Sequence, residues 1–83
     1  MTTMEYGGKV YSYEKLAGLL EALVKDGNGV MLEGTPHDAA GDIRWRCVIT
    51  HRGKQLPCEA PDLWLAVTPA VEWLKEYERD DPN

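Results

Sequence analysis

The sequence predicts an α+β domain in which a small antiparallel sheet of about three strands carries two helices on one face. Two stretches repeat apolar residues at helical spacing, one near each end of the chain, and between them apolar and polar residues alternate. Short glycine-containing turns separate these stretches. With an extra N-terminal ribbon, the expected order is strand, helix, three strands and helix. We expect one domain over 1–83 with flexible ends at 1–4 and 79–83.

A short ribbon is expected first, since Gly7 and Gly8 supply the positive backbone dihedrals of a two-residue hairpin turn. A helix over 13–25 follows, with Ser12 as its N-cap. Gly27 ends this helix because glycine readily adopts the left-handed conformation of the C′ position. The predicted buried stripe has i, i+3, i+4, i+7, i+8 spacing and comprises Leu16, Leu19, Leu20, Leu23 and Val24.

The first two strands of the sheet are expected over 30–33 and 43–50, on either side of a surface loop. The loop covers 34–41, a stretch with glycine at both ends and Pro36 inside it. The second strand alternates in the manner of a half-buried strand. Its inward face comprises Ile43, Trp45, Cys47 and Ile49, and its outward face comprises Arg44, Arg46, Val48 and Thr50.

A two-residue turn at Arg52 and Gly53 is expected to connect the second strand to a third. In this register Pro57 occupies a non-hydrogen-bonded position, where its missing N–H costs the ladder nothing. Counting outward from the turn pairs His51 with Lys54, Ile49 with Leu56, Cys47 with Cys58 and Arg46 with Glu59.

The last element begins at 60–62 and reads as one long helix. Pro69 lies in its middle and lacks the N–H that an internal helical residue donates. The helix therefore either kinks at Pro69 or restarts there with Thr68 as its N-cap. The apolar residues at helical spacing are Leu63, Ala66, Val67, Ala70, Val71, Leu74 and Tyr77.

Composition limits the function classes. The chain has 83 residues, 9 basic and 14 acidic side chains, and a formal net charge of −5. This balance disfavours sequence-independent binding to DNA or anionic membranes, which depends on basic side chains. We expect a cytoplasmic protein without a membrane partner, because the chain has no signal peptide and no apolar run of about 18–20 residues. A chain this short has a thin core, so neither an enzyme nor a cofactor is expected.

Basic residues concentrate in the predicted hairpin. Between Ile43 and Cys58 the only charged side chains are Arg44, Arg46, Arg52 and Lys54, which leaves 5 of the 9 basic and all 14 acidic groups elsewhere. Together with His51 these four residues form a basic ribbon that suits phosphates or an acidic partner. The alternative is a solvated sheet face in which Arg46 and Glu59 form a weak cross-strand pair.

The two cysteines are too few for a disulfide scaffold or a four-cysteine zinc site, so reduced thiols are expected. The hairpin register sets Cys47 opposite Cys58, near the separation that a disulfide needs. The alternative, favoured by a reducing compartment, is that both are small thiols packed in the core beside Trp45, Ile49 and Leu56.

A metal site is a further candidate, because Glu33, His37, Asp38 and Asp42 cluster around the loop and His51 adds a nitrogen. Their spacing matches no known ligand pattern, and a Thr-Pro-His-Asp stretch is typical of a turn with a solvated carboxylate. No metal is therefore expected. A catalytic nucleophile is not expected either, since Ser12 reads as a helix cap and Cys47 as a buried thiol.

Two tryptophans lie off the main apolar stripe of the last helix. Trp64 and Trp73 either extend the core or anchor a partner, because aromatic side chains are enriched among interface hot spots. In the second case the acidic residues Glu72 and Glu76 form the rim of the contact.

Helix, three strands and helix is also the order of double-stranded RNA-binding domains. In those domains the last helix starts with lysines, whereas residues 60–65 here read Ala-Pro-Asp-Leu-Trp-Leu. The Ile-Arg-Trp-Arg-Cys-Val-Ile strand at 43–49 and the Ala-Pro-Asp-Leu-Trp-Leu-Ala-Val segment at 60–67 resemble the small phage-encoded proteins called the phage ABA sandwich. This resemblance covers about half of the chain and transfers no functional residue. In size and charge the chain is similar to phage inhibitors of host defence enzymes.

Three functional hypotheses follow. The leading one is a non-enzymatic protein-binding module, either a homo-oligomer or an inhibitor or adaptor of a larger complex, with Trp64 and Trp73 as anchors. The second is a nucleic-acid-associated protein that uses the basic ribbon. The third is a small metal-dependent enzyme built on Glu33, His37 and Asp42.

Overall fold

The computed structural model describes residues 2–36 and 41–80, with side chains through Glu78. The described residues form an α+β fold with two α-helices, a two-stranded sheet and a three-stranded sheet, which confirms the predicted fold class and element order. The elements are β1 (Met4–Tyr6), β2 (Lys9–Tyr11), a 3-10 turn (Tyr13–Lys15), α1 (Leu16–Lys25), β3 (Gly29–Pro36), β4 (Ile43–His51), β5 (Lys54–Ala60) and α2 (Leu63–Asp80).

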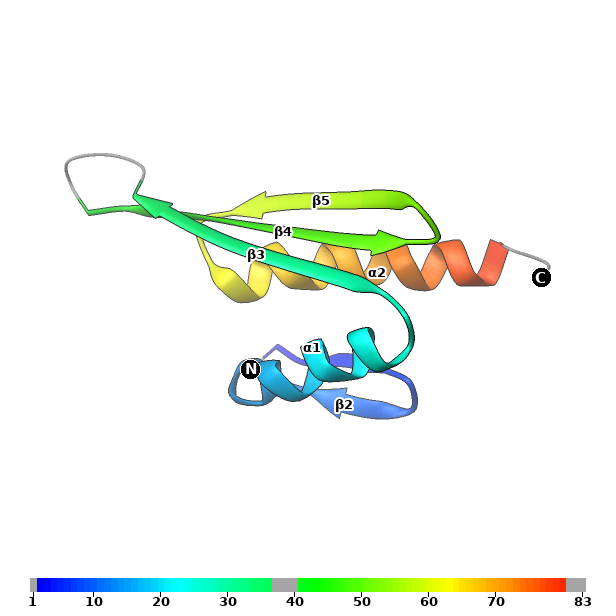
Figure 1. The fold of residues 1–83 in the computed structure, drawn as a ribbon. Coiled ribbons are helices and arrows are strands. Elements are labelled where there is room, and N and C mark those ends of the chain that lie inside the picture. The colour runs from blue at the N-terminus through cyan, green and yellow to red at the C-terminus, as the bar shows by residue number, and fades with distance from the viewer. Residues whose placement is uncertain (1, 37–40, 81–83) are drawn as a thin grey trace.

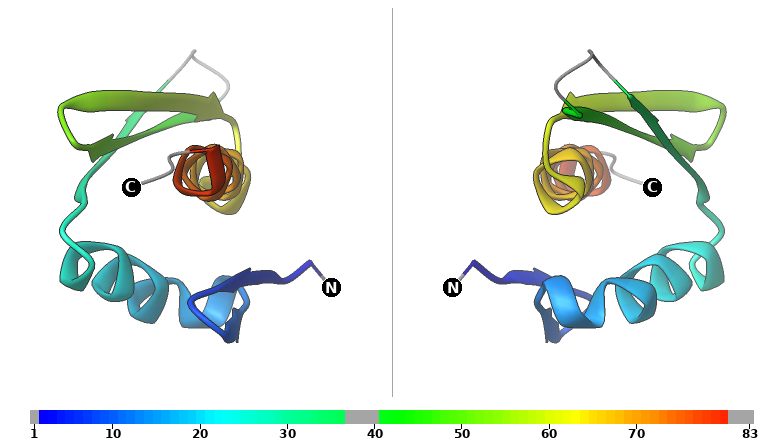
Figure 2. Two further views of the ribbon diagram at one scale, coloured as in Figure 1. Left: turned by 90° about the vertical axis from the view of Figure 1, so that its right-hand side faces the viewer. Right: turned by 90° about the vertical axis from the view of Figure 1, so that its left-hand side faces the viewer.

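α2 occupies the middle of three layers. The antiparallel sheet has the order β3-β4-β5 and covers one side of α2, while α1 and the β1–β2 hairpin lie on the opposite side (Figures 1 and 2). The core joins Met4 and Tyr6 of the hairpin to leucines of α1 and to residues of β4, β5 and α2. Five core residues of α2 have no exposed surface, namely Ala66, Val67, Ala70, Val71 and Leu74.

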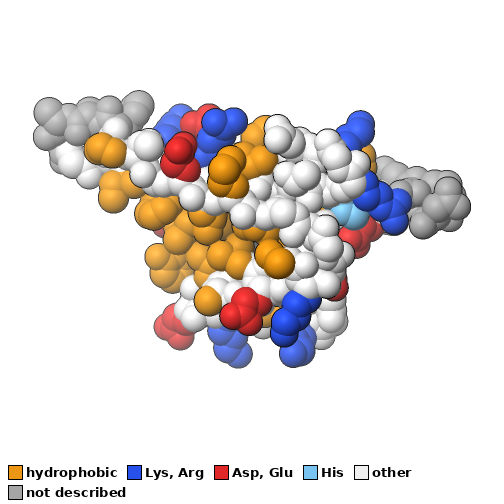
Figure 3. All heavy atoms as spheres, viewed as in Figure 1, with side chains coloured by type: hydrophobic (Ala, Val, Ile, Leu, Met, Phe, Trp, Pro, Cys, Tyr) orange, Lys and Arg blue, Asp and Glu red, His pale blue; other side chains and the backbone are white. Residues whose placement is uncertain are grey.

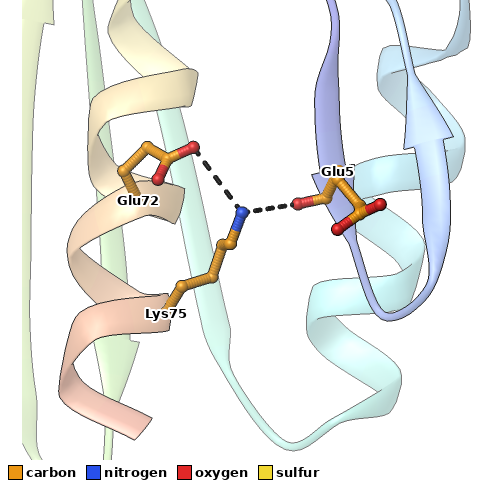
Figure 4. Close-up of polar contacts among 3 residues, drawn as sticks. All are labelled: Glu5, Glu72 and Lys75. Carbon is orange, nitrogen blue, oxygen red and sulfur yellow. Dashed lines mark hydrogen bonds and ion pairs between the residues drawn. The ribbon is translucent and has the colours of Figure 1, made fainter. Parts of the chain in front are cut away.

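The N-terminal hairpin confirms the predicted ribbon. Gly7 and Gly8 have φ values of 60° and 82°, as the two central residues of a tight hairpin turn require. Met4 is 5% exposed and belongs to the core, although 1–4 was expected to be a flexible end. Lys75 of α2 holds the hairpin in place, since its Nζ donates a hydrogen bond of 2.9 Å to the Glu5 carbonyl and lies 3.6 Å from Glu72 Oε1 (Figure 4).

The first helix departs from two expectations. A 3-10 turn precedes it, and the Ser12 side chain makes no capping hydrogen bond, although the Ser12 carbonyl accepts one from the Lys15 N–H at 2.9 Å. Leu16, Leu19 and Leu23 are buried, Leu20 is half-buried, and Val24 is 57% exposed. The predicted burial of Val24 was wrong because α1 contacts β2 and β3 and leaves the side that bears Val24 uncovered.

A glycine and one side-chain hydrogen bond define the end of α1. Gly27 has a φ of 93° and ends the helix as predicted. The hydroxyl of Tyr6 donates a hydrogen bond of 2.5 Å to Asp26, which ties β1 to this end. Burial, followed by the hydrogen bond to Asp26, raises the pKa of Tyr6 above its usual value.

The predicted β4–β5 register is confirmed. All four expected pairs are present, and the turn residues Arg52 and Gly53 have φ values of 51° and 83°. Val48 was expected on an exposed outward face but is 5% exposed, because it lies on the central strand between Met31 and Pro57. Ile43, expected inward, is 47% exposed, because the ends of β3 and β4 extend past the start of α2 (Figure 1).

β3 is longer than predicted and includes 34–36, which were assigned to a loop. Gly34 pairs with Trp45, and a Cβ atom at Gly34 would lie 2.6 Å from Cζ3 of the indole ring. The glycine therefore serves close side-chain packing inside a strand. Residues 37–40 of the expected loop lie outside the described residues.

α2 runs through Pro69 as a single helix, so the alternative of a restart at Thr68 is not observed. Its N-cap is Asp62, whose Oδ1 accepts a hydrogen bond of 3.2 Å from the Leu65 N–H. The helix continues to Asp80 and so includes part of the segment expected to be a flexible end.

We expect Gly34→Ala to destabilise the fold by about 1–3 kcal/mol, because the added methyl group forces the Trp45 ring to move. Gly29→Ala is the matched control in the same strand, since its Cβ atom would meet Thr50 Cβ at 3.4 Å. Its effect should stay within about 0.5 kcal/mol. Urea unfolding of the three proteins measures this difference, and equal losses in both variants would contradict the packing of Trp45 on Gly34.

Candidate protein-binding face

The two candidate tryptophan anchors differ in their exposure to solvent. Trp64 is 5% exposed and belongs to the core, so its proposed role as a surface anchor was wrong. It follows the same face of α2 as Val67 and Val71, and this face is buried because α2 is covered on two sides. Trp73 is 46% exposed and remains a candidate anchor. Within the described chain, the indole Nε1 of buried Trp64 has no hydrogen-bond partner.

Trp73 belongs to an exposed apolar stripe along α2. Leu65, Trp73 and Tyr77 are 52%, 46% and 40% exposed, and the half-buried Pro69 lies between the first two. These four residues, at successive i, i+4 positions, share one side of the helix, and we call them the α2 face.

The α2 face is hollowed next to β5. An open pocket of about 310 Å³ is lined by Leu56, Trp73, Glu76 and Tyr77. Leu56 is 7% exposed and joins the pocket to the core. Lys54 lies over Tyr77, with its Nζ 5.4 Å from the centroid of the ring, a cation–π distance. The pocket therefore has apolar and aromatic walls that β5 and α2 supply together.

Of the two acidic residues predicted to form a rim, only Glu76 lines this pocket. Glu72 and Glu76 are both exposed on α2. Glu72 forms an ion pair with Lys75, whose amine also binds the Glu5 carbonyl (Figure 4). Glu76 lines the pocket directly. An aromatic centre with one carboxylate at its edge suits a partner that presents an apolar side chain beside a basic one.

The five residues of the predicted basic ribbon do not converge. Arg44 and Arg46 lie on the outward side of β4, where Glu33 and Glu59 are the register partners of Arg46 on the two neighbouring strands. His51 and Lys54 have the register parity of the inward side and contact Asn28 and Tyr77 respectively. Arg52 lies in the turn. This layout divides the positive charge between two sides of the sheet.

A hydrogen-bonded link through Asn28 was missed by the sequence analysis. Asn28 is 4% exposed, and its side-chain amide donates a hydrogen bond of 3.1 Å to the Leu23 carbonyl at the end of α1. Its Oδ1 lies 2.7 Å from His51 Nδ1, so the imidazole nitrogen donates. The only sequence signal is an asparagine between Gly27 and Gly29, and a turn explains that pattern equally well.

The cysteines are free thiols, as expected. Cys47 is fully buried in the core, which confirms its predicted packing, and burial followed by the neighbouring Cys58 raises its pKa to about 11. Cys58 is half-buried, and burial followed by the charge of Glu59 raises its pKa. Both shifts favour the neutral thiol, which is a poor nucleophile.

The candidate metal ligands are only partly within the structure. His37 and Asp38 lie outside the described residues, while Glu33 and Asp42 are exposed. Among the residues that the structure describes, no three histidine, cysteine, aspartate or glutamate side chains are grouped closely enough to hold a metal ion. In residues 2–36 and 41–80, no helix has the length and apolar character needed to cross a membrane.

Comparison with known proteins gives no relative, since no family model, no curated protein and no solved structure matches this chain. Function has to be inferred from the residues and their geometry.

We expect both thiols to react slowly with Ellman's reagent in the folded protein at pH 8, and Cys47 to react more slowly than Cys58. A thiol pKa near 11 leaves on the order of a hundredfold less thiolate at this pH than an ordinary cysteine has. Reaction rates of Cys47→Ala and Cys58→Ala variants, with and without denaturant, separate the two thiols. Fast native reaction of the thiol that remains in Cys58→Ala would contradict the burial of Cys47.

Proposed function

We propose that this protein is a non-enzymatic protein-binding module that acts as an inhibitor or adaptor of a larger complex, and that the α2 face is its contact surface. The observation that carries the proposal is the position of Trp73, half-exposed beside a pocket that Leu56 and Tyr77 line. Trp and Tyr are enriched among the residues that dominate binding energy in protein interfaces.

Exposing Trp73 to water is unfavourable in free energy, and the fold does not require an apolar residue at this position. A helix side open to water is normally polar, and charged side chains at these positions would keep the domain soluble. Instead, Leu65, Trp73 and Tyr77 keep apolar surface in contact with water. Burying such surface stabilises a complex by about 25 cal/mol per Å² before the costs of association.

Charge indicates the chemistry of the partner. Glu76 lines the pocket beside Trp73, and the chain carries a formal net charge of −5. An acidic surface of this kind attracts a basic protein surface and disfavours nucleic acid. The expected partner site therefore has an apolar pocket for the tryptophan and lysine or arginine side chains around it.

The basic-ribbon hypothesis stays a prediction with less support. Nucleic acid would meet Arg44 and Arg46 on a sheet face that also carries Glu33 and Glu59, while His51 and Lys54 are engaged on the other side. Carboxylates beside the arginines oppose the approach of phosphates.

We expect Trp73→Ala to reduce retention of the partner by about tenfold or more, as loss of a hot-spot residue does. Tagged wild-type protein and variant are used to capture partners from nuclease-treated lysate of the source cells, and the proteins retained are quantified by mass spectrometry. Tyr13→Ala is the control, because Tyr13 is also an exposed aromatic residue, 56% exposed, but lies on the 3-10 turn. Equal loss in both variants, or no difference from wild type, would contradict the α2 face as the binding surface.

The same two tryptophans should separate stability from binding. Trp64→Ala is expected to destabilise the domain by about 3–5 kcal/mol, because it leaves a large cavity in the core. Trp73→Ala should cost less than about 1 kcal/mol, because the side chain is half-exposed. Thermal and urea unfolding measure both, and a large loss of stability in Trp73→Ala would show that Trp73 belongs to the core.

A further inference from the structure

The two free edges of the three-stranded sheet differ in how they are protected. His51 and Lys54 flank the two-residue turn and form a hydrogen-bonded pair, and such pairs alternate along the ladder. The backbone groups of Gln55, Pro57 and Glu59 therefore point away from β4. Pro57 has no N–H, so the β5 edge lacks a donor at its centre.

The β3 edge has no such block at its centre. By the same alternation, Met31 and Glu33 bond to β4, and the backbone groups of Val30, Leu32 and Gly34 point away from it. Proline enters this strand only at its last residue, Pro36. An edge with free N–H and C=O groups is a template for another strand.

An apolar groove lies along this open edge. It has a volume of about 470 Å³ and runs between β3 and α1. Figure 3 shows hydrophobic side chains gathered between these two elements on the face where β3 is in front. Val24, on the groove wall, is 57% exposed. The lining residues are Leu20, Glu21, Val24, Lys25, Val30 and Leu32.

We propose that a second copy of this chain occupies the site, with the two β3 strands paired antiparallel about a two-fold axis. The axis lies beside Met31, so that Val30 of each copy is opposite Leu32 of the other and the two Met31 side chains face each other. The result is a continuous six-stranded sheet. This proposal is independent of the α2 face, which flanks the β5 edge.

The pattern of side chains supports this register. The outward side of the sheet has an apolar row of Met31, Val48 and Pro57, and Met31 ends that row 59% exposed. Pairing at Met31 joins the rows of the two copies and covers both methionines. A register centred on Glu33 would bring two carboxylates directly opposite each other, which is destabilising.

The charges of the groove are self-complementary. Glu21 and Lys25 are one helical turn apart on α1, and they are the charged residues that line the groove. A two-fold axis reverses the direction of the second helix, so Glu21 of each copy approaches Lys25 of the other. Self-complementarity of this kind is the condition for a two-fold interface. A partner strand with charges of a single sign would meet one favourable and one unfavourable residue.

The test is the mass in solution, measured by sedimentation equilibrium over a range of concentrations. We expect wild-type protein to associate to twice the 9.3 kDa mass of the chain. Met31→Lys and Met31→Glu should each weaken dimerisation at least about tenfold, because like charges then lie directly opposite each other. An equimolar mixture of the two variants should recover the dimer, because opposite charges then meet on the axis.

A matched pair of valine variants tests the groove. Val24→Lys should weaken dimerisation at least about tenfold, whereas Val10→Lys, at an equally exposed valine of β2, should leave it unchanged. Three results would each overturn the proposal: a monomer at concentrations up to about 1 mM, a dimer that the Met31 and Val24 variants leave intact, or mixed Met31 variants that stay monomeric. A monomer that still binds its partner through Trp73 would leave the proposed function standing.

Discussion

Burial of α2 from two opposite sides is the constraint on which the rest of the structure depends. The sheet covers one side of the helix, and the N-terminal hairpin and α1 cover the other (Figure 2). Ala66 and Ala70 keep the helix narrow enough for close packing of neighbouring elements, which a dense interior requires. The hairpin therefore has a structural role, and the bonds from Lys75 to Glu5 and from Tyr6 to Asp26 connect it to α2 and to the end of α1.

The proline in this central helix is linked to a cysteine on the sheet. Pro69 has no N–H, so the Leu65 carbonyl, four residues earlier, lacks its usual helical donor. The Cys58 thiol of β5 lies 3.8 Å from this carbonyl oxygen and acts as a weak donor. The raised pKa of Cys58 favours the protonated form that can donate. Cys58 thus partly replaces a backbone hydrogen bond of α2.

Local chemistry made much of this fold predictable from the sequence. The register of β4 and β5 follows from two turn residues and a count, and the Gly27 stop follows from backbone geometry. The burial of Trp64 and the exposure of Val24 depend on where the hairpin packs, and that placement involves contacts between residues some seventy positions apart, such as Glu5 and Lys75. The bond between Asn28 and His51 likewise joins elements whose proximity no periodicity indicates. In the candidate site, helical spacing singled out both Trp64 and Trp73. Which of the two is buried depends on the layer formed by α1 and the hairpin, and the spacing does not indicate that layer.

The same constraint explains which surfaces remain open and gives their composition meaning. With α2 covered on two sides, the side that carries the α2 face stays open to water beside β5. α1 packs one side toward α2, and its side toward the β3 edge stays open to water. Where the sheet has an outward face, charged residues such as Arg46 and Glu59 occupy it, as solubility requires. The α2 face and the groove between β3 and α1 instead expose apolar side chains, among them Trp73, Tyr77 and Val24. At both surfaces, exposed apolar side chains line a hollow beside an edge strand of the sheet, which is typical of contact surfaces. This composition supports the proposal that both surfaces are contact sites of the domain.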